Sequence, residues 1–242
     1  MTRLFLDEVI RQQTLITITG EKAHYLSTVL RCRPDDIVIV TDSTGTAYSA
    51  CISAITKKQA TLLIAGLLHQ DNESPLTIIL LQGLLKGEKM DLVIQKSTEL
   101  GVMEIVPMIT ERSQIRETRK LQRWQKIAGE ASRQCGRNKI PMIHEPETFE
   151  TVIASQRLDK GIICSEKEGA PFSAALDTFK DRKTIVLCVG PEGGFSEKEL
   201  RAAEDQGFIV ASLGKRILRA ETAALTVIAL TQFVLGDLSG RK

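Results

Sequence analysis

Two glycine-bearing turns in the last quarter of the chain carry the residues best suited to bind a ligand. The first is Gly190–Phe195 (GPEGGF) and the second is Leu213–Arg219 (LGKRILR). Each turn follows a short apolar run and leads toward a helical pattern, so both are expected at the carboxyl ends of strands. Ligands of open α/β sheets bind beyond those ends. The spacing therefore predicts one site at which the two turns meet.

An acid in the first turn and another two residues after the second turn indicate the kind of ligand. Glycine turns ahead of helices commonly bind phosphates, but Glu192 and Glu221 would repel a pyrophosphate, and no G-x-G-x-x-G or G-K-[ST] pattern is present. Carboxylates suit a ribose hydroxyl or a cation, which favours a nucleoside-type ligand such as S-adenosylmethionine. The alternatives are a plain tight turn at Gly193–Gly194, a Glu192 that the helix dipole favours, and ordinary surface roles for Arg216 and Arg219.

The elements that position the two turns follow an alternating strand and helix rhythm, which predicts a mostly parallel sheet covered on both faces. Ser196 and Glu199 have the spacing of a capping box, so a helix is expected to begin at Ser196 and to end near Gly207. The predicted strands are Thr77–Gln82, Glu104–Ile109, Gly161–Cys164, Thr184–Val189 and Phe208–Leu213. The predicted helices are Lys89–Leu100, Arg119–Cys135, Thr148–Ser155, Ser196–Gln206 and Ala220–Leu235.

The first 68 residues have a different pattern, with short β-rich runs around a single helix. Strands are predicted at Arg3–Leu6, Leu15–Thr19, Asp36–Thr41, Ala47–Ile55 and Ala60–Leu68, and the helix at Glu21–Arg31. Short antiparallel strands around a helix indicate a small barrel. The polar segment His69–Pro75 ends in proline and is the best linker candidate. Two domains are therefore expected, at residues 1–70 and 75–242.

The bulk properties exclude several classes of protein. With 242 residues and 43% apolar content, the chain can form one or two domains with a substantial core. Its five cysteines lack a C-x-x-C pattern, which favours free thiols in a reducing compartment. Its three histidines form no metal-spaced cluster, so no metal is expected. No apolar run approaches a membrane span, and an acidic pair interrupts the amino terminus, so we expect a cytoplasmic protein.

A net charge of +2 conceals a strongly basic segment. Between Thr110 and Ile140, nine basic residues face only three acidic ones, which gives this segment a charge of +6. A local positive field of this size attracts polyanions such as nucleic acid. The alternative is an ordinary solvated helix face.

The two turns together resemble the signature of the bacterial 16S ribosomal RNA uracil-N3 methyltransferases, which belong to the SPOUT superfamily. The resembling stretches are Gly190–Ser196 and Leu213–Ala223. Further matching motifs extend along nearly the whole chain, at His24–Arg31, Leu84–Asp91, Gln95–Gly101, Glu111–Ser113, Arg123–Trp124, Glu130–Ala131, Gln134–Arg137 and Ile140–Pro141.

This resemblance implies a fold and an activity. The fold is a small PUA-like β-barrel domain followed by an α/β SPOUT methyltransferase domain with a trefoil knot. The activity is S-adenosylmethionine-dependent methylation of N3 of one uridine, conventionally numbered 1498, in 16S ribosomal RNA of the small (30S) subunit. A homodimer is also implied; the apolar segment Ala223–Leu235 is either its interface or a core helix. The alternatives are a SPOUT enzyme that modifies another RNA nucleotide and a non-catalytic ribosome assembly factor.

The resemblance also assigns roles to residues. Arg219 is expected to stabilise charge on the target base, and Glu221 to act as a base or to orient the cofactor. The expected cofactor-binding residues are Gly190, Pro191, Glu192, Gly193, Gly194, Leu213, Gly214, Ile217, Leu218 and Thr222. The expected RNA-binding residues are Arg31, Lys86, Arg112, Arg116, Arg123, Arg133 and Arg137.

Overall fold

The computed structural model describes residues 2–10, 14–69, 72–155 and 160–240. The chain divides into two compact units, one of residues Met1–Asn72 with Arg133–Lys139, the other of residues Glu73–Ser132 with Ile140–Lys242. The segment Arg133–Lys139, from the middle of the chain, thus packs with the amino-terminal unit. The predicted bounds of two continuous domains, 1–70 and 75–242, placed this segment in the second domain. Within the predicted linker His69–Pro75, residues 70–71 lie outside the described residues.

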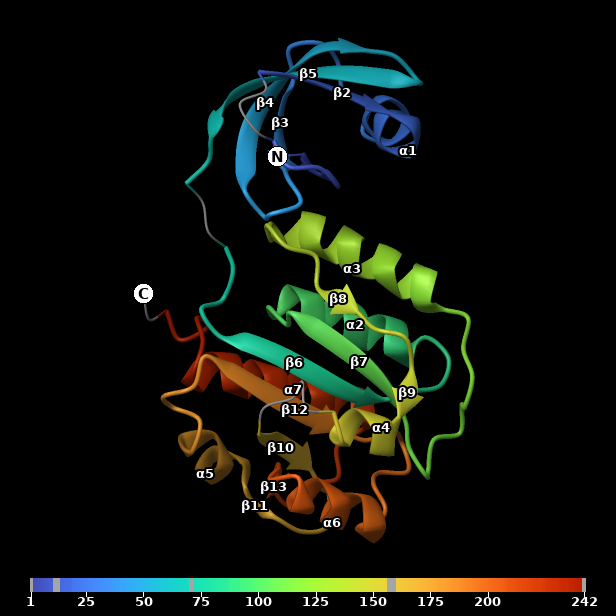
Figure 1. Cartoon of the computed structure of the whole chain (residues 1–242), viewed down its shortest axis with the longest axis vertical. Helices are drawn as coiled ribbons and strands as arrows, with labels where there is room; N and C mark the ends of the chain where they lie inside the picture. The colour runs from blue at the N-terminus through green and yellow to red at the C-terminus, as the bar shows by residue number, and fades with distance from the viewer. Residues whose placement is uncertain (1, 11–13, 70–71, 156–159, 241–242) are drawn as a thin grey trace. The chain divides into compact units, whose positions relative to one another are not determined.

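The first unit is built on a curled five-stranded sheet with the order β1-β3-β4-β5-β2 (Figure 1). Its strands are β1 (Arg3–Phe5), β2 (Leu15–Thr19), β3 (Ile37–Thr41), β4 (Ala47–Ile55) and β5 (Gln59–Leu67). Four of the strands pair antiparallel, as predicted, but β1 pairs parallel with β3. The predicted helix is shorter than expected: α1 (Gly20–His24) continues as a π-helix, η1 (Tyr25–Val29), and Arg31 follows with a φ of 54°.

The second unit contains an eight-stranded sheet in which every pair of described strands is parallel; the sequence predicted a mostly parallel sheet. The order is β11-β13-β10-β12-β6-β7-β8, and β9 also pairs with β7. The strands are β6 (Thr77–Gly83), β7 (Glu104–Ile109), β8 (Met142–Ile143), β9 (Glu147–Thr148), β10 (Gly161–Cys164), β11 (Ala170–Pro171), β12 (Thr184–Val189) and β13 (Ile209–Ser212).

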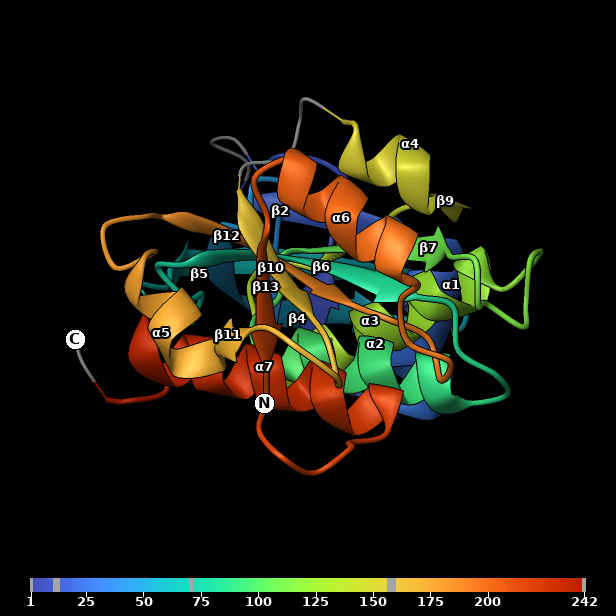
Figure 2. The ribbon, with the colours of Figure 1, turned by 90° about the horizontal axis from the view of Figure 1, so that it is seen from below.

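Helices cover both faces of this sheet (Figure 2). They are α2 (Lys89–Glu99), α3 (Leu121–Cys135), α4 (Phe149–Ile153), α5 (Phe172–Asp177), α6 (Glu197–Asp205) and α7 (Ala220–Val234). Successive side chains of a strand point to opposite faces, so Ile78 and Leu80 of β6 join a core with α2, α3, α5 and α7. Ile79 and Leu81 join a second core with α4 and α6.

The start of α6 confirms the predicted capping box. The Ser196 hydroxyl accepts the Glu199 backbone N–H, and the Glu199 carboxylate accepts the Ser196 N–H at 2.8 Å. Gly207, with a φ of +84°, follows the end of the helix as predicted. None of the described helices combines the length and hydropathy that crossing a lipid bilayer would require.

Candidate active site

A cavity of about 460 Å³ opens at the carboxyl ends of β10, β12 and β13. The two predicted turns both line it, so the structure brings them together as the sequence predicted. A third segment, the loop Ser165–Glu168 after β10, completes the wall. The volume lies within the range of pockets that hold small ligands and cofactors.

Most of the predicted ligand-binding residues line this cavity, and Arg219 lines it with them. The lining includes Gly190, Pro191, Glu192, Gly194, Leu213, Gly214, Ile217 and Leu218. Gly193, Glu221 and Thr222 do not belong to it. Gly193 is turned toward Arg112, whose Nη1 donates a hydrogen bond to the Gly193 carbonyl at 3.2 Å. Arg112, predicted to bind RNA, thereby lies at the cavity wall.

Glycine is required at one position of this first turn and at one position of the strand beside it. Gly194 has a φ of +66°, which side chains other than glycine rarely adopt, and its N–H closes the turn by donating to the Pro191 carbonyl at 2.9 Å. Gly83, at the end of β6, lies so close to the turn that a Cβ there would overlap the backbone nitrogen of Pro191. The turn is therefore held against the neighbouring strand by backbone contact.

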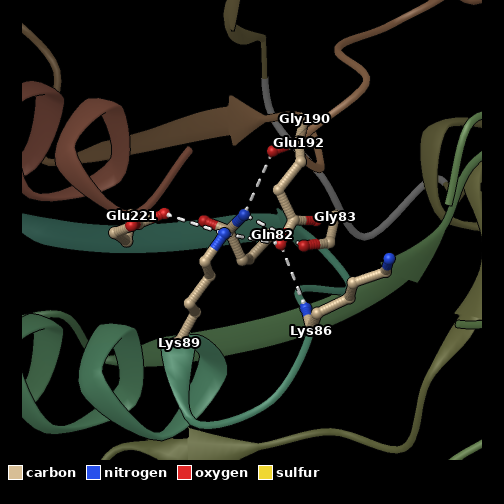
Figure 3. A network of polar contacts seen from close by, with 7 residues as sticks. All are labelled: Gln82, Gly83, Lys86, Lys89, Gly190, Glu192 and Glu221. Carbon is tan, nitrogen blue, oxygen red and sulfur yellow. Dashed lines mark hydrogen bonds and ion pairs between the residues drawn. The ribbon is translucent and has the colours of Figure 1, made fainter. Parts of the chain in front are cut away.

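Polar contacts from the segment after β6 also hold the first turn (Figure 3). The buried Gln82 amide donates to the Gly83 carbonyl at 3.0 Å and to the Gly190 carbonyl at 3.3 Å. Glu192 Oε1 lies 3.0 Å from Lys89 Nζ and accepts the Lys86 backbone N–H at 3.2 Å. Burial alone would raise the pKa of Glu192, but the hydrogen bond from Lys89 and the backbone donors lower it overall. Glu192 is therefore ionised.

Glu199 is a second anchor that the sequence did not identify as part of the site. Its carboxylate is 3% exposed and serves two loops at once. Besides the capping contact to Ser196, Glu199 Oε1 accepts the backbone N–H of Glu111 at 2.8 Å. This bond holds the segment that presents Arg112 to the first turn. The capping-box spacing predicted the contact to Ser196 but not the second one.

The loop after β10 was also missed. It brings Ser165, Glu166, Lys167 and Glu168 to the cavity wall. The available signal was its position directly after the predicted strand Gly161–Cys164, because parallel strands end at one edge.

Burial raises the pKa of the Cys164 thiol to about 12. That thiol therefore stays protonated near neutral pH.

Arg219 is one of three arginines that line the cavity, with Arg112 and Arg216. It is the residue before α7, with extended backbone angles (φ −63°, ψ 150°), and its side chain is exposed. Within the described residues, its guanidinium forms no hydrogen bond or ion pair. Its five donors are therefore open to a ligand.

The basic segment does not form one exposed face. Arg112, Arg116 and Arg123 are exposed, although Arg123 Nη2 is paired with Asp91 Oδ2 at 2.7 Å. In the first unit, the Arg133 guanidinium lies 5.3 Å from the centre of the Tyr25 ring.

Arg137, which was expected to bind RNA, is only 3% exposed, so its side chain is not presented to solvent. Gly136, with a φ of +83°, turns the chain after α3 and directs Arg137 into the first unit. By contrast, Arg31 and Lys86 are exposed. The described residues contain no group of three or more His, Cys, Asp or Glu side chains arranged to hold a metal ion.

Two known protein families match the chain. The family of the RNA methyltransferase domain matches residues 72–232, and the family of the RNA methyltransferase PUA domain matches residues 18–65. Ribosomal RNA small subunit methyltransferase E of Buchnera aphidicola subsp. Acyrthosiphon pisum is 35% identical to the chain. The similarity covers 97% of this chain and 94% of that protein.

Solved structures resemble the chain over the same length. One is ribosomal RNA small subunit methyltransferase E from Neisseria gonorrhoeae bound to S-adenosylmethionine, with a TM-score of 0.90 and 35% identity. The match covers 98% of this chain and 99% of that one. A structure from Legionella pneumophila with the cofactor S-adenosylmethionine bound has a TM-score of 0.89 and 33% identity, over 98% of this chain and 99% of that one.

Proposed function

Because the chain belongs to the ribosomal RNA small subunit methyltransferase E family, we propose that it methylates N3 of one uridine in small-subunit ribosomal RNA. The methyl donor is S-adenosylmethionine. The observation that carries the proposal is the cavity between the two turns, in a chain that resembles donor-bound relatives over nearly its full length. A ribosomal substrate implies an enzyme of the cytoplasm.

The cavity wall fits such a donor. Backbone groups of the Gly190–Phe195 and Leu213–Arg219 turns are accessible because glycines leave them uncovered, and they would hold the adenine and ribose. Carboxylates of Glu166, Glu168 and Glu192 also line the cavity and suit the donor's cationic ammonium and sulfonium groups. S-adenosylmethionine supplies an electrophilic methyl group on a positive sulfur.

The protein's part in the reaction is alignment and charge stabilisation. N3 lies on the Watson–Crick edge, so the uridine must be unpaired or turned out of its stack to enter the site. N3 first gives its proton to solvent water, which leaves a negative charge spread over N3, O2 and O4. N3 then bonds to the methyl group as the sulfur–methyl bond breaks, and the neutral thioether leaves. We assign stabilisation of that charge to Arg219. Glu221 orients the site rather than taking the proton, because its carboxylate pairs with Lys89 and Glu221 itself is not part of the cavity lining.

Incubation with labelled S-adenosylmethionine and small ribosomal subunits tests this function. We expect label in 16S ribosomal RNA, and mass spectrometry of the digested RNA to place it on N3 of a single uridine. Label on another nucleotide would indicate a different specificity within the superfamily. Absence of label, with intact binding to subunits, would favour a non-catalytic assembly factor.

We assign residues 1–70 to a PUA-like RNA-binding domain and residues 75–242 to the methyltransferase domain, and we expect both to contact RNA. Reversing one exposed arginine in each, with Arg31→Glu and Arg116→Glu, should weaken RNA binding. Each lost phosphate contact lowers the slope of log affinity against log salt by roughly 1. Filter binding at several salt concentrations measures this slope.

The matched control for RNA binding is Lys57→Glu with Lys180→Glu, which reverses one exposed lysine in each unit outside the predicted RNA-binding set. We expect the control to keep the parental slope. An unchanged slope in the arginine variant would place the RNA surface elsewhere.

We further propose that the protein is a homodimer whose interface includes the outer face of α7. Leu230 and Phe233 of this helix are 41% and 58% exposed, and Leu92 of α2 is 40% exposed. Phe233→Glu should convert dimers to monomers in sedimentation velocity, because a charge in an apolar interface is costly to desolvate. Leu67→Glu, at an exposed apolar residue of the first unit, should leave the oligomeric state unchanged. A monomeric parent would contradict the proposal.

A further inference from the structure

Lys89 lies between two carboxylates that come from different parts of the chain. Its ammonium nitrogen is 3.0 Å from Glu192 Oε1 and 4.0 Å from Glu221 Oε2 (Figure 3). Lys89 begins α2, Glu192 lies in the turn after β12, and Glu221 lies in the first turn of α7. One side chain thus connects three elements that are far apart in the sequence.

The two carboxylates depend on Lys89 to different degrees. Glu192 Oε1 also accepts the Lys86 backbone N–H at 3.2 Å. Glu221 Oε2 is buried and has no hydrogen-bond partner within the described residues, and its ion-pair partner is Lys89. A buried carboxylate oxygen without a hydrogen bond is strongly destabilised unless a nearby positive charge compensates it. Besides the amino end of α7, the ammonium of Lys89 supplies that charge.

Each carboxylate is joined to one side of the cavity. Glu192 belongs to the turn whose Pro191 and Gly194 line the wall. Glu221 follows Arg219 by two residues, and Arg219 lines the cavity at the start of the same helix. Movement of either acid would therefore move a group that we assign to donor binding or to charge stabilisation.

We propose that Lys89 is a positioning residue that holds the Gly190–Phe195 turn and the first turn of α7 in register, so that the donor-binding turn and Arg219 face one cavity. The inference rests on the proposed function, since it concerns the same site. Lys89 also lines the cavity, so a direct contact with the ligand is the rival explanation. Removing the charges of the two acids separates these explanations.

Lys89→Met in the full chain is the first test. It keeps a long side chain but leaves two carboxylates without their cation. Loss of a charged hydrogen bond of this kind should weaken S-adenosylmethionine binding by about 10- to 100-fold in calorimetry and should also lower turnover on small subunits. In hydrogen exchange, residues 190–196 and 220–224 should exchange faster.

Lys96→Met is the matched control. Lys96 lies on the same helix, and its side chain is 40% exposed, against 38% for Lys89. Its ammonium pairs with Glu99 at 2.9 Å, a contact within α2 alone. We expect parental donor affinity, turnover and exchange in this variant. Equal effects of the two substitutions would overturn the proposal, because they would reflect only a general loss of charge from α2.

The rescue experiment combines Lys89→Met with Glu192→Gln and Glu221→Gln. If Lys89 acts through the acids, this triple variant should regain the donor affinity of the Glu192→Gln, Glu221→Gln double variant to within about threefold. If the triple variant stays as weak as Lys89→Met, Lys89 acts on the ligand directly and the proposal is overturned. Should Lys89→Met alone fail to fold, folding and donor binding of the triple variant would support the proposal, and their failure would overturn it.

Donor binding by the parent protein distinguishes a failure of this inference from a failure of the proposed function. A parent that does not bind S-adenosylmethionine removes the proposed function. A parent that binds it, with Lys89→Met binding equally well, removes only the role of Lys89.

Discussion

Arg219→Ala is expected to lower the turnover number for methyl transfer by about 10²- to 10³-fold, with affinity for S-adenosylmethionine changed by no more than a few-fold. Arg219 lines the cavity and its guanidinium has no partner within the described residues. Its hydrogen bonds are therefore available to the target base. An interaction made mainly with the deprotonated target base lowers turnover when it is lost, rather than the affinity for the donor.

Single-turnover kinetics with saturating RNA measures the rate of methyl transfer separately from substrate binding. Calorimetry gives the affinity for S-adenosylmethionine. Arg216→Ala is the matched control, because Arg216 is exposed in the same turn and also lines the cavity. We expect that variant to alter RNA affinity more than turnover. Because the Arg219 guanidinium forms no hydrogen bond or ion pair with the described residues, its loss should change the free energy of unfolding by less than about 0.5 kcal/mol. Parental turnover in Arg219→Ala would remove this residue from the mechanism.

The sequence predicted the central elements of the second unit closely because their signals are local. The runs Glu104–Ile109, Gly161–Cys164 and Thr184–Val189 are apolar and bounded by polar or turn residues, and the structure has strands with these same bounds. The capping box at Ser196 was predicted for the same reason: its two hydrogen bonds join residues three positions apart. Local spacing also placed the two turns at one edge of the sheet.

Other features depend on contacts between distant residues, which spacing does not encode. The strands Met142–Ile143, Glu147–Thr148 and Ala170–Pro171 have two residues each, too few for any periodic pattern. Arg137 belongs to a basic run, and its burial follows from the turn at Gly136 and the packing of this segment with the first unit. A knotted connection likewise leaves no pattern in the residues, and only the family resemblance implied it.

The same distinction applies within the site. The turns whose backbone groups are expected to bind the ligand were predictable, because their glycines are visible in the sequence. The side chains that hold those turns were not, since a single lysine at the start of a helix has many ordinary explanations. Lys89 gains its significance from Glu192 and Glu221, which lie more than one hundred residues away. The groups expected to meet the ligand were thus easier to predict than the groups that support them.

Gly194→Val is expected to weaken S-adenosylmethionine binding by about 100-fold or more, because a β-branched residue at a φ of +66° carries strain of about 1–3 kcal/mol and the turn must shift to relieve it. A Cβ at this position would also lie 3.3 Å from both carboxylate oxygens of Glu166, across the cavity wall. The shift would move the backbone groups that we assign to donor binding. Gly194→Ala, with a smaller side chain, should have an intermediate effect.

Gly207→Val is the control that shows whether Gly194→Val loses donor binding through backbone strain in general or through damage to the donor-binding turn. Gly207 has a φ of +84° and lies between α6 and β13, away from the cavity lining. The three atoms nearest to a Cβ there would belong to the flexible side chain of Lys160, at 3.4 Å or more. Both valine variants should lower the free energy of unfolding by a similar amount, but only Gly194→Val should lose the donor in calorimetry. If Gly194→Val bound S-adenosylmethionine as tightly as Gly207→Val, the first turn would not form the donor pocket, and the assignment of the cavity would have to be abandoned.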